Sequence, residues 1–179
     1  LTIRSRPEGH ELSRGDLSTP QGRAAIEAFF KGYMAGELRG EPRVLEGPAE
    51  PTPFSFSDVA AKVVSLINTA SVADLGRHIG REVDPLRFRG NLLIEDLEPW
   101  AEFDLLGRVL TAPSGARLEV VKRIVRCAAT EVDPATGLRD MSVPRTLQKA
   151  YGHMDCGVYA RVLDGGALNA GDRLVAEAQ

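Results

Sequence analysis

The sequence predicts an α+β chain that is predominantly β, built as a barrel or sandwich with a few short peripheral helices. The main observation is a series of about seven short apolar runs, separated by turn residues over roughly 115 positions, which is the spacing of such folds. One amphipathic helix precedes this series. Hydrophobic residues make up 43% and charged residues 26% of the 179 residues, fractions typical of a globular protein with a sizeable core.

Residues 1–53 are predicted to contain the end of an N-terminal β region, one amphipathic helix and a linker. Leu1–Arg4 alternates like the tail of a strand. Residues 16–36 have apolar side chains at helical spacing, a proline in the first turn and a terminal glycine, which together predict a helix. Residues 36–57 contain four prolines and three glycines, so we expect regular structure to stop there and place the domain boundary within this linker.

Residues 54–179 are predicted to form the second domain. Its expected strands, bounded by turn residues, are Lys62–Ile67, Phe88–Ile94, Trp100–Leu110, Ala116–Val121, Ile124–Val132, Cys156–Leu163 and Arg173–Ala176. The first of these is mostly apolar and is expected to be buried on both faces. Ser71 and Asp74 form a capping-box-like start for a short helix that ends at Gly80, and a second short helix is expected over Pro144–Tyr151.

Charge and composition exclude several classes of function. The net charge of −3 disfavours a dedicated nucleic-acid binder, because neutralising phosphates requires a surplus of basic residues. The apolar runs are too short to span a membrane. Two cysteines form no disulfide framework and no signal peptide opens the chain, so we expect a cytoplasmic protein. Because the first residue is Leu1 rather than Met, we expect a piece of a longer chain.

The segment from Arg87 to Asn91 is the first candidate site. On a strand, Arg87, Arg89 and Asn91 would share one face, and two guanidinium groups beside an amide would suit an anionic group. The alternative is a solvated strand face whose arginines pair with nearby acids. The acids that could do so are Glu95, Asp96, Glu98, Glu102 and Asp104.

Cys127 is the second candidate, because three cations precede it in the segment that begins at Lys122. Nearby positive charge favours the thiolate, which is the nucleophilic and metal-ligating form of cysteine. The alternative is a buried structural cysteine. On a strand, Arg126 and Cys127 would point to opposite faces. A zinc site made from Cys127, His153 and Cys156 would lack paired cysteine ligands, and no motif supports a Cys–His hydrolase.

Several segments, taken in order, resemble the MOSC domain, which is named for the C-terminal domain of molybdenum cofactor sulfurase. The matching stretches are Phe56-Ser57-Asp58, Ser71-x-x-Asp74-Leu75, Arg87-Phe88-Arg89-Gly90-Asn91, Trp100-x-x-Phe103, Arg126-Cys127-x-x-Thr130-x-Val132-Asp133-Pro134-x-Thr136-Gly137, Pro144-x-Thr146-Leu147, Cys156-Gly157-Val158-Tyr159-Ala160, and Gly166 through Gly171-Asp172. They cover residues 54–179. Each stretch alone is weak, but the ordered series is specific, and it is most similar to the amidoxime-reducing members of the family.

The resemblance implies a MOSC-type β-barrel and a molybdenum–pterin cofactor (molybdopterin). It assigns Cys127 as the catalytic thiolate, either as the protein ligand to molybdenum or as the carrier of a sulfane sulfur. It also implies cofactor contacts at Arg89, Asn91 and Arg126, where cations and an amide suit an anionic pterin phosphate. Tyr159 matches a tyrosine that lies near the metal in the amidoxime-reducing relatives.

The chain departs from the family pattern in three places. Residues 1–50 show no Pro-x-Lys motif of an N-terminal barrel, which leaves open whether this piece retains the cofactor. Gly90 replaces the usual proline and makes the local backbone less constrained. Cys156 stands where reductase-type relatives carry an aromatic residue, and we expect it to be a buried core cysteine. The pyridoxal-phosphate half of the fused sulfurases is absent, so desulfurase activity is not expected in this chain.

Three functions follow as hypotheses. The first is a molybdenum-dependent oxidoreductase domain that reduces N–O bonds or transfers oxygen atoms and takes electrons from a separate donor protein, because two cysteines cannot hold an iron–sulfur cluster. The second is a sulfur carrier that receives a persulfide on Cys127 from a pyridoxal-dependent desulfurase. The third is a β-barrel interaction module without a cofactor. The residues leave open whether the chain is an enzyme.

Overall fold

The computed structural model describes residues 1–5, 8–45 and 61–177. The chain divides into two compact units, Leu1–Ser55 and Phe56–Gln179. The predicted boundary after residue 53 and the Phe56-Ser57-Asp58 motif lie outside the described residues. Among the helices of the described ranges, none is long and apolar enough to cross a membrane.

The first unit contains a two-stranded sheet and one helix. Strand β1 (Thr2–Arg4) pairs antiparallel with β2 (Glu11–Arg14), and α1 (Pro20–Tyr33) follows. The helix begins at Pro20 because the side chain of Thr19 caps it by accepting a hydrogen bond from the backbone N–H of Gly22. Ile26 is buried on its inner face. The helix predicted for 16–36 is confirmed, with both ends shorter.

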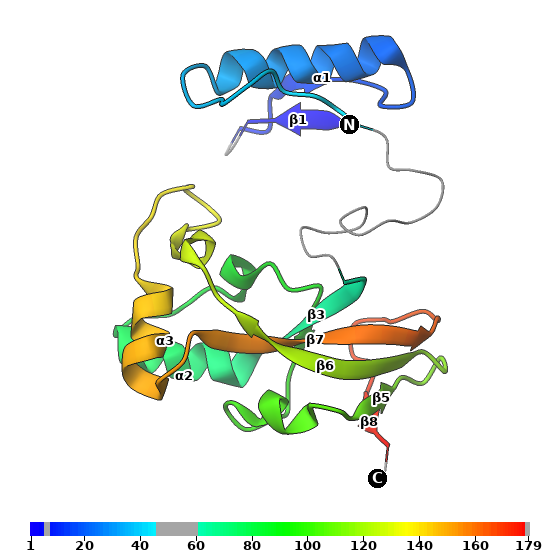
Figure 1. Ribbon diagram of the computed structural model, residues 1–179, viewed down its shortest axis with the longest axis vertical. Helices are drawn as coiled ribbons and strands as arrows, with labels where there is room; N and C mark the ends of the chain where they lie inside the picture. Colours follow the sequence, from blue (N-terminus) through cyan, green and yellow to red (C-terminus); the bar gives the residue numbers. More distant parts are fainter. Residues whose placement is uncertain (6–7, 46–60, 178–179) are drawn as a thin grey trace. The chain divides into compact units, whose positions relative to one another are not determined.

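The second unit is built on a six-stranded sheet that curls as an open half-barrel (Figure 1). The strand order is β4-β3-β7-β6-β5-β8, in which only the β3–β4 pair is parallel. The strands are β3 (Val63–Asn68), β4 (Leu92–Ile94), β5 (Val109–Thr111), β6 (Arg117–Val125), β7 (Asp155–Asp164) and β8 (Val175–Ala176). The predominantly β class with short peripheral helices is confirmed.

Helices pack against one face of this sheet. The α-helices are α2 (Thr69–Ile79) and α3 (Val143–Tyr151), and three 3₁₀ helices complete the unit, namely η1 (Pro85–Phe88), η2 (Ala101–Leu105) and η3 (Ala128–Glu131). Leu75 and Leu147 of the two α-helices pack with Ile67 and Cys156 of the sheet. On the other face, Leu66 belongs to a second buried cluster. Strand β3 is therefore buried on both faces, as its sequence predicts.

Three of the predicted strands are largely wrong, because a 3₁₀ helix occupies part of each. Trp100–Leu110 contains the 3₁₀ helix η2, and only Val109 and Leu110 at its end belong to a strand. The backbone of Trp100 is left-handed (φ 68°), which interrupts any extended run. Phe88–Ile94 is extended only over its last three residues, because Asp84 caps the preceding 3₁₀ helix by accepting a hydrogen bond from the N–H of Leu86.

The predicted capping box at Ser71 is also wrong. Helix α2 begins two residues earlier, at Thr69, because Asn68 caps it by accepting a hydrogen bond from the N–H of Ala70. The helix ends as predicted at Gly80, whose backbone is left-handed. The predicted continuation of the sheet over Ile124–Val132 stops at Val125, where β6 ends.

Candidate functional site

Cys127 lies just after β6 and immediately before the 3₁₀ helix η3. Its backbone is extended (φ −112°) and its side chain is exposed. Its carbonyl oxygen accepts hydrogen bonds from the Thr130 hydroxyl (2.9 Å) and the Thr130 backbone N–H (3.1 Å). The backbone at Cys127 is therefore fixed while its thiol is open to solvent. The alternative of a buried structural cysteine is wrong for this residue.

Arg126, the preceding residue, is turned inward and is only 8% exposed. Its Nε–H donates to the carbonyl oxygen of Cys156 (2.8 Å) and its Nη1 to the carbonyl oxygen of Phe88 (3.0 Å), while the guanidinium lies over the Phe88 ring. Burial lowers the pKa of this guanidinium, and electrostatic interactions with Cys156, Tyr159 and Cys127 oppose that shift. Its Nη2 is buried and has no hydrogen-bond partner in the described part of the chain. The Nη2 group of Arg126 is therefore a buried donor group that the described residues leave unpaired.

Arg89 and Arg87 do not share a strand face. Arg89 ends η1 with a left-handed backbone (φ 50°) and is exposed, and no described residue forms a hydrogen bond or ion pair with its side chain. Arg87 is buried two residues earlier. At Gly90, an added Cβ would lie 2.3 Å from Cγ1 of Ile67, so a glycine at this position lets the segment approach β3 closely.

Asn91 is held by strand β3. Its Oδ1 accepts hydrogen bonds from the backbone N–H and the hydroxyl of Ser65, both at 2.9 Å, and its own N–H donates to the carbonyl oxygen of Ser65. The Oδ1 of Asn91 is therefore occupied. Its Nδ2 forms no hydrogen bond with the described residues and is available as a donor.

Next to Asn91, a row of polar residues runs across strands β3, β7 and β6. Ser65 of β3 lies opposite Tyr159 of β7, and Tyr159 lies opposite Lys122 of β6. Directly opposed residues on paired strands present their side chains to the same face. Tyr159 and Lys122 thus present their side chains to one face of the sheet, and Asn91 is joined to this row by its hydrogen bonds with Ser65. Lys122 is exposed, and within the described residues nothing forms an ion pair with it.

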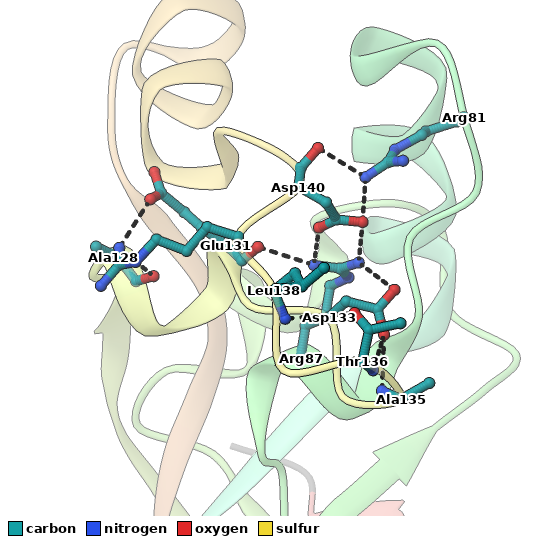
Figure 2. Close-up of polar contacts among 10 residues, drawn as sticks. Arg81, Arg87, Ala128, Glu131, Asp133, Ala135, Thr136, Leu138 and Asp140 are labelled. Carbon is teal, nitrogen blue, oxygen red and sulfur yellow. Dashed lines mark hydrogen bonds and ion pairs between the residues drawn. The ribbon is translucent and has the colours of Figure 1, made fainter. Parts of the chain in front are cut away.

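The loop that follows Cys127 is tied to the body of the unit by Arg87 (Figure 2). The Arg87 guanidinium forms a bidentate pair with Asp140 (2.8 and 2.9 Å) and also donates to Asp133 (3.3 Å) and to the carbonyl oxygen of Glu131 (3.1 Å). Arg81 pairs with Asp140 from its other side (2.5 Å). Hydrogen bonds from Arg87, and then from Arg81, keep the pKa of Asp140 below its usual range despite desolvation.

These contacts correct both hypotheses about the Arg87–Asn91 segment. Arg87 does not belong to an anion-binding face, because its side chain is 3% exposed and occupied by carboxylates. Its partners Asp133 and Asp140 also lie outside the group of acids at 95–104 that the sequence offered. Arg87 therefore positions the loop, and only Arg89 and Asn91 of the three predicted residues remain exposed.

Cys156 is a core cysteine, as predicted. It is fully buried, and burial raises the pKa of its thiol to about 12, with Arg126 and Glu102 acting in opposite directions. Within the described residues, no group of three or more His, Cys, Asp and Glu side chains is arranged to hold a metal ion, so the zinc site considered for Cys127, His153 and Cys156 does not form.

The two cysteines are expected to react with iodoacetamide at very different rates. At neutral pH, Cys127 should be alkylated at least about a hundred times faster than Cys156, because the thiolate is the reacting species and Cys156 is both buried and hard to ionise. Mass spectrometry of the two cysteine peptides over a time course measures both rates. Equal rates under native conditions would contradict the placement of these thiols.

Sequence patterns did not identify Ser65, and they suggested Glu102 only as a possible ion-pair partner of the arginines at 87 and 89. Glu102 is fully buried in η2, and the signal for it is an acid placed between Trp100 and Phe103, two aromatic residues at the spacing of one turn. Ser65 is the partner of Asn91, and its position within the mostly apolar β3 carries the same kind of signal. In both cases, a polar residue in an apolar run indicates a buried hydrogen-bond partner.

Curated relatives of this chain include two kinds of protein. The molybdenum cofactor sulfurase of Caenorhabditis briggsae is 37% identical over 100 residues, which is 54% of this chain and 14% of that protein. Mitochondrial amidoxime reducing component 2 of Rattus norvegicus is 26% identical over 184 residues, 96% of this chain and 53% of that protein. Mitochondrial amidoxime-reducing component 1 of Mus musculus is 33% identical over 97 residues, which is 54% of this chain and 27% of that protein. The chain thus spans about half or less of each relative.

The fold has a counterpart among solved structures. The crystal structure of YiiM from Geobacillus stearothermophilus aligns with a TM-score of 0.50 and 21% sequence identity over 64% of this chain and 54% of that chain. A family model described as the MOSC domain matches residues 47–175 of the sequence. That match covers most of the chain, and the chain belongs to the MOSC domain family.

Proposed function

We propose that this chain is a molybdenum-cofactor-binding domain of an oxidoreductase that reduces N–O bonds or transfers oxygen atoms, with Cys127 as the protein ligand to the metal. The observation that carries the proposal is the exposed thiol of Cys127, which follows Arg126 directly in the chain, together with cationic donors that no described residue occupies. These donors are the Arg89 guanidinium and Nη2 of Arg126. Membership of the family, and relatives named as a cofactor sulfurase and as amidoxime-reducing components, support a role associated with the molybdenum cofactor.

The residues of the site fit such a cofactor chemically. A thiolate is a soft ligand suited to a metal held by sulfur atoms. A buried guanidinium nitrogen without a partner is costly unless a further acceptor meets it, and an anionic group would do so. Arg89, the Nδ2 of Asn91 and Nη2 of Arg126 would hold the anionic end of the cofactor, and Cys127 would hold the metal.

The bound cofactor would supply two-electron chemistry, and the protein would supply position and charge. Arg126 fixes the backbone that carries Cys127, while Thr130 fixes its carbonyl oxygen. Tyr159 would line the site and, together with Lys122, would bound it along the sheet. A separate electron-donor protein would deliver the reducing equivalents.

A second candidate function is a sulfur carrier, favoured by the sulfurase relatives, whose local identity to this chain exceeds that of the amidoxime-reducing ones. In this case, the Cys127 thiolate would attack the persulfide of a pyridoxal-dependent desulfurase. The outer sulfur would transfer to Cys127 and the donor cysteine would leave as a thiolate. The exposure of Cys127 suits this transfer as well.

The test is the cofactor content of two matched cysteine variants. The chain, and the longest product of its gene, are purified from a molybdenum-replete host, and molybdenum is measured by mass spectrometry and pterin by fluorescence after oxidation. We expect near-stoichiometric metal and pterin, reduced at least about tenfold by Cys127→Ser, because a metal ligand is lost. The control Cys156→Ala removes the buried thiol and should retain the cofactor.

Absence of metal and pterin from every form, in a host with confirmed cofactor synthesis, would contradict the oxidoreductase proposal. Labelling with sulfane sulfur then separates the two remaining outcomes. Label on Cys127 that Cys127→Ser abolishes would support the carrier. No label would favour an interaction module without a cofactor.

A further inference from the structure

The peptide group between Cys156 and Gly157 in strand β7 is bound from both sides by buried charged side chains. Its carbonyl oxygen accepts the Nε–H of Arg126 at 2.8 Å. Its N–H donates to Oε1 of Glu102 at 3.3 Å. The positive group therefore meets the negative end of the peptide dipole, and the carboxylate meets the positive end. Two hydrogen bonds aligned through one polarised amide strengthen each other, more so away from water.

Hydrogen-bond donors to both of its carboxylate oxygens hold Glu102 in position for the contact with the Gly157 N–H. The residue is 0% exposed. Its second oxygen, Oε2, accepts hydrogen bonds from the Ser71 hydroxyl (2.7 Å) and from Nδ2 of Asn68 (3.0 Å). No described Lys or Arg pairs with this carboxylate. The peptide is thus the route by which Glu102 meets a cation, the guanidinium of Arg126.

Because Arg126 is held in this way, it also fixes the positions of two candidate cofactor contacts. Its Nη1 donates to the carbonyl oxygen of Phe88, the residue immediately before Arg89. Arg126 itself immediately precedes Cys127. One guanidinium therefore sets the separation between the segment that carries Arg89 and the segment that carries the thiol.

Gly157 leaves the room that the arrangement requires. A Cβ at this position would lie 2.5 Å from the carbonyl oxygen of Leu66 and 3.2 Å from Nη2 of Arg126. Any side chain would push against β3 and against the guanidinium. The bare backbone at Gly157 allows both charged groups to reach the same peptide.

We infer that Glu102 is a positioning residue for the proposed cofactor site, acting through the Cys156–Gly157 peptide to hold Arg126 and thereby Cys127 and Arg89. The inference rests on the proposed function for what the site binds. The positioning itself is a property of the protein alone and is measurable without any cofactor.

The experiment compares Glu102→Gln with Ser71→Ala. Glutamine keeps the size of the side chain but removes its charge, and when its amide nitrogen faces the N–H of Gly157 that hydrogen bond is lost. Ser71→Ala removes the hydrogen bond that the hydroxyl donates to the far side of the same carboxylate and the one that it accepts from the Trp100 N–H. Asn68 still donates to Oε2, and the contact with the peptide stays in place. The two readouts are hydrogen exchange of the Arg126 Nε–H by NMR and the iodoacetamide rate of Cys127, with thermal unfolding measured alongside.

Glu102→Gln should raise the exchange rate of the Arg126 Nε–H by about tenfold, as expected when a charge-assisted hydrogen bond weakens, and should change the Cys127 rate severalfold. Ser71→Ala should leave both rates near their wild-type values, although it should lower the thermal stability by a similar amount. Equal effects of the two variants would show a merely structural carboxylate and overturn the inference. An unchanged Cys127 rate in Glu102→Gln would do so too.

A measurement on the wild-type chain covers the case in which Glu102→Gln does not fold. The amide proton of Gly157 and the Nε–H of Arg126 bind through the same peptide, so one opening should expose both, and their exchange rates should agree within about tenfold. A Gly157 amide that exchanges far faster would overturn the inference. Because these readouts need no molybdenum, their failure is distinct from the loss of metal that tests the proposed function.

Discussion

Gly157→Ala is expected to reduce the free energy of unfolding by about 3 kcal/mol or more. The backbone of Gly157 is left-handed (φ 78°), which costs a residue with a Cβ about 1–2 kcal/mol. The new methyl group would also lie 2.5 Å from a backbone oxygen of β3, and overpacking of this kind costs about 1–3 kcal/mol. Urea denaturation followed by circular dichroism measures the change.

Gly152→Ala is the matched control for this prediction. Gly152 has nearly the same backbone conformation (φ 76°), but no heavy atom lies within 4 Å of an added Cβ. Gly152→Ala should therefore lose only the free energy of the left-handed backbone, about 1–2 kcal/mol. Similar losses in the two variants would show that β3 does not crowd Gly157.

Arg87→Ala is expected to release the loop after Cys127 and to destabilise the second unit by about 3 kcal/mol. Removing one partner of a buried ion pair costs about 3–5 kcal/mol, and the lower end applies because Asp140 is 27% exposed and can regain water. Hydrogen exchange of the Asp140 amide, which donates to the carbonyl oxygen of Glu131, should accelerate strongly. Arg81→Ala is the control, since Arg81 pairs with the same carboxylate but is 48% exposed, and should change stability by less than about 1 kcal/mol.

The effect of Arg87→Ala should depend on pH in a defined direction. Because the folded-state pKa of Asp140 is lowered, this carboxylate contributes stability above its unfolded-state pKa and loses that contribution as the pH falls through the lowered value. The difference in unfolding free energy between the wild type and Arg87→Ala should therefore be largest near neutral pH and should shrink in acid. A difference that grows on acidification would contradict the assignment of Asp140 as the partner of Arg87.

Local sequence patterns predicted the elements whose structure depends on near neighbours. The helix at 16–36, the strand that begins at Val63 and the helix end at Gly80 were predicted correctly, because periodicity, caps and terminal glycines act over a few residues. Trp100–Leu110 was predicted wrongly as a strand. Its aromatic residues favour a strand locally, but the burial of Glu102 against donors from α2 and β7 favours a 3₁₀ turn.

For the candidate site too, the sequence predicted the placement of some residues and not of others. The sequence predicted Cys156 as a core residue, and this placement is confirmed, but it left Cys127 open between a reactive thiol and a buried structural cysteine, and only the structure places it at the surface. The strand face proposed for Arg87, Arg89 and Asn91 was wrong. Asp140 lies 53 residues from Arg87 in sequence, and no local pattern predicts that pairing.

The sequence by itself determined the family, the predominantly β class and the thiol around which a site could form, because composition, periodicity and ordered motifs are properties of the linear chain. Only the tertiary structure decided which charges are available. It buries Arg87 against carboxylates and Arg126 against carbonyl oxygens, and it leaves Arg89 exposed. A buried charge requires partners at hydrogen-bond distance, and those partners come from strands and loops that only folding brings together.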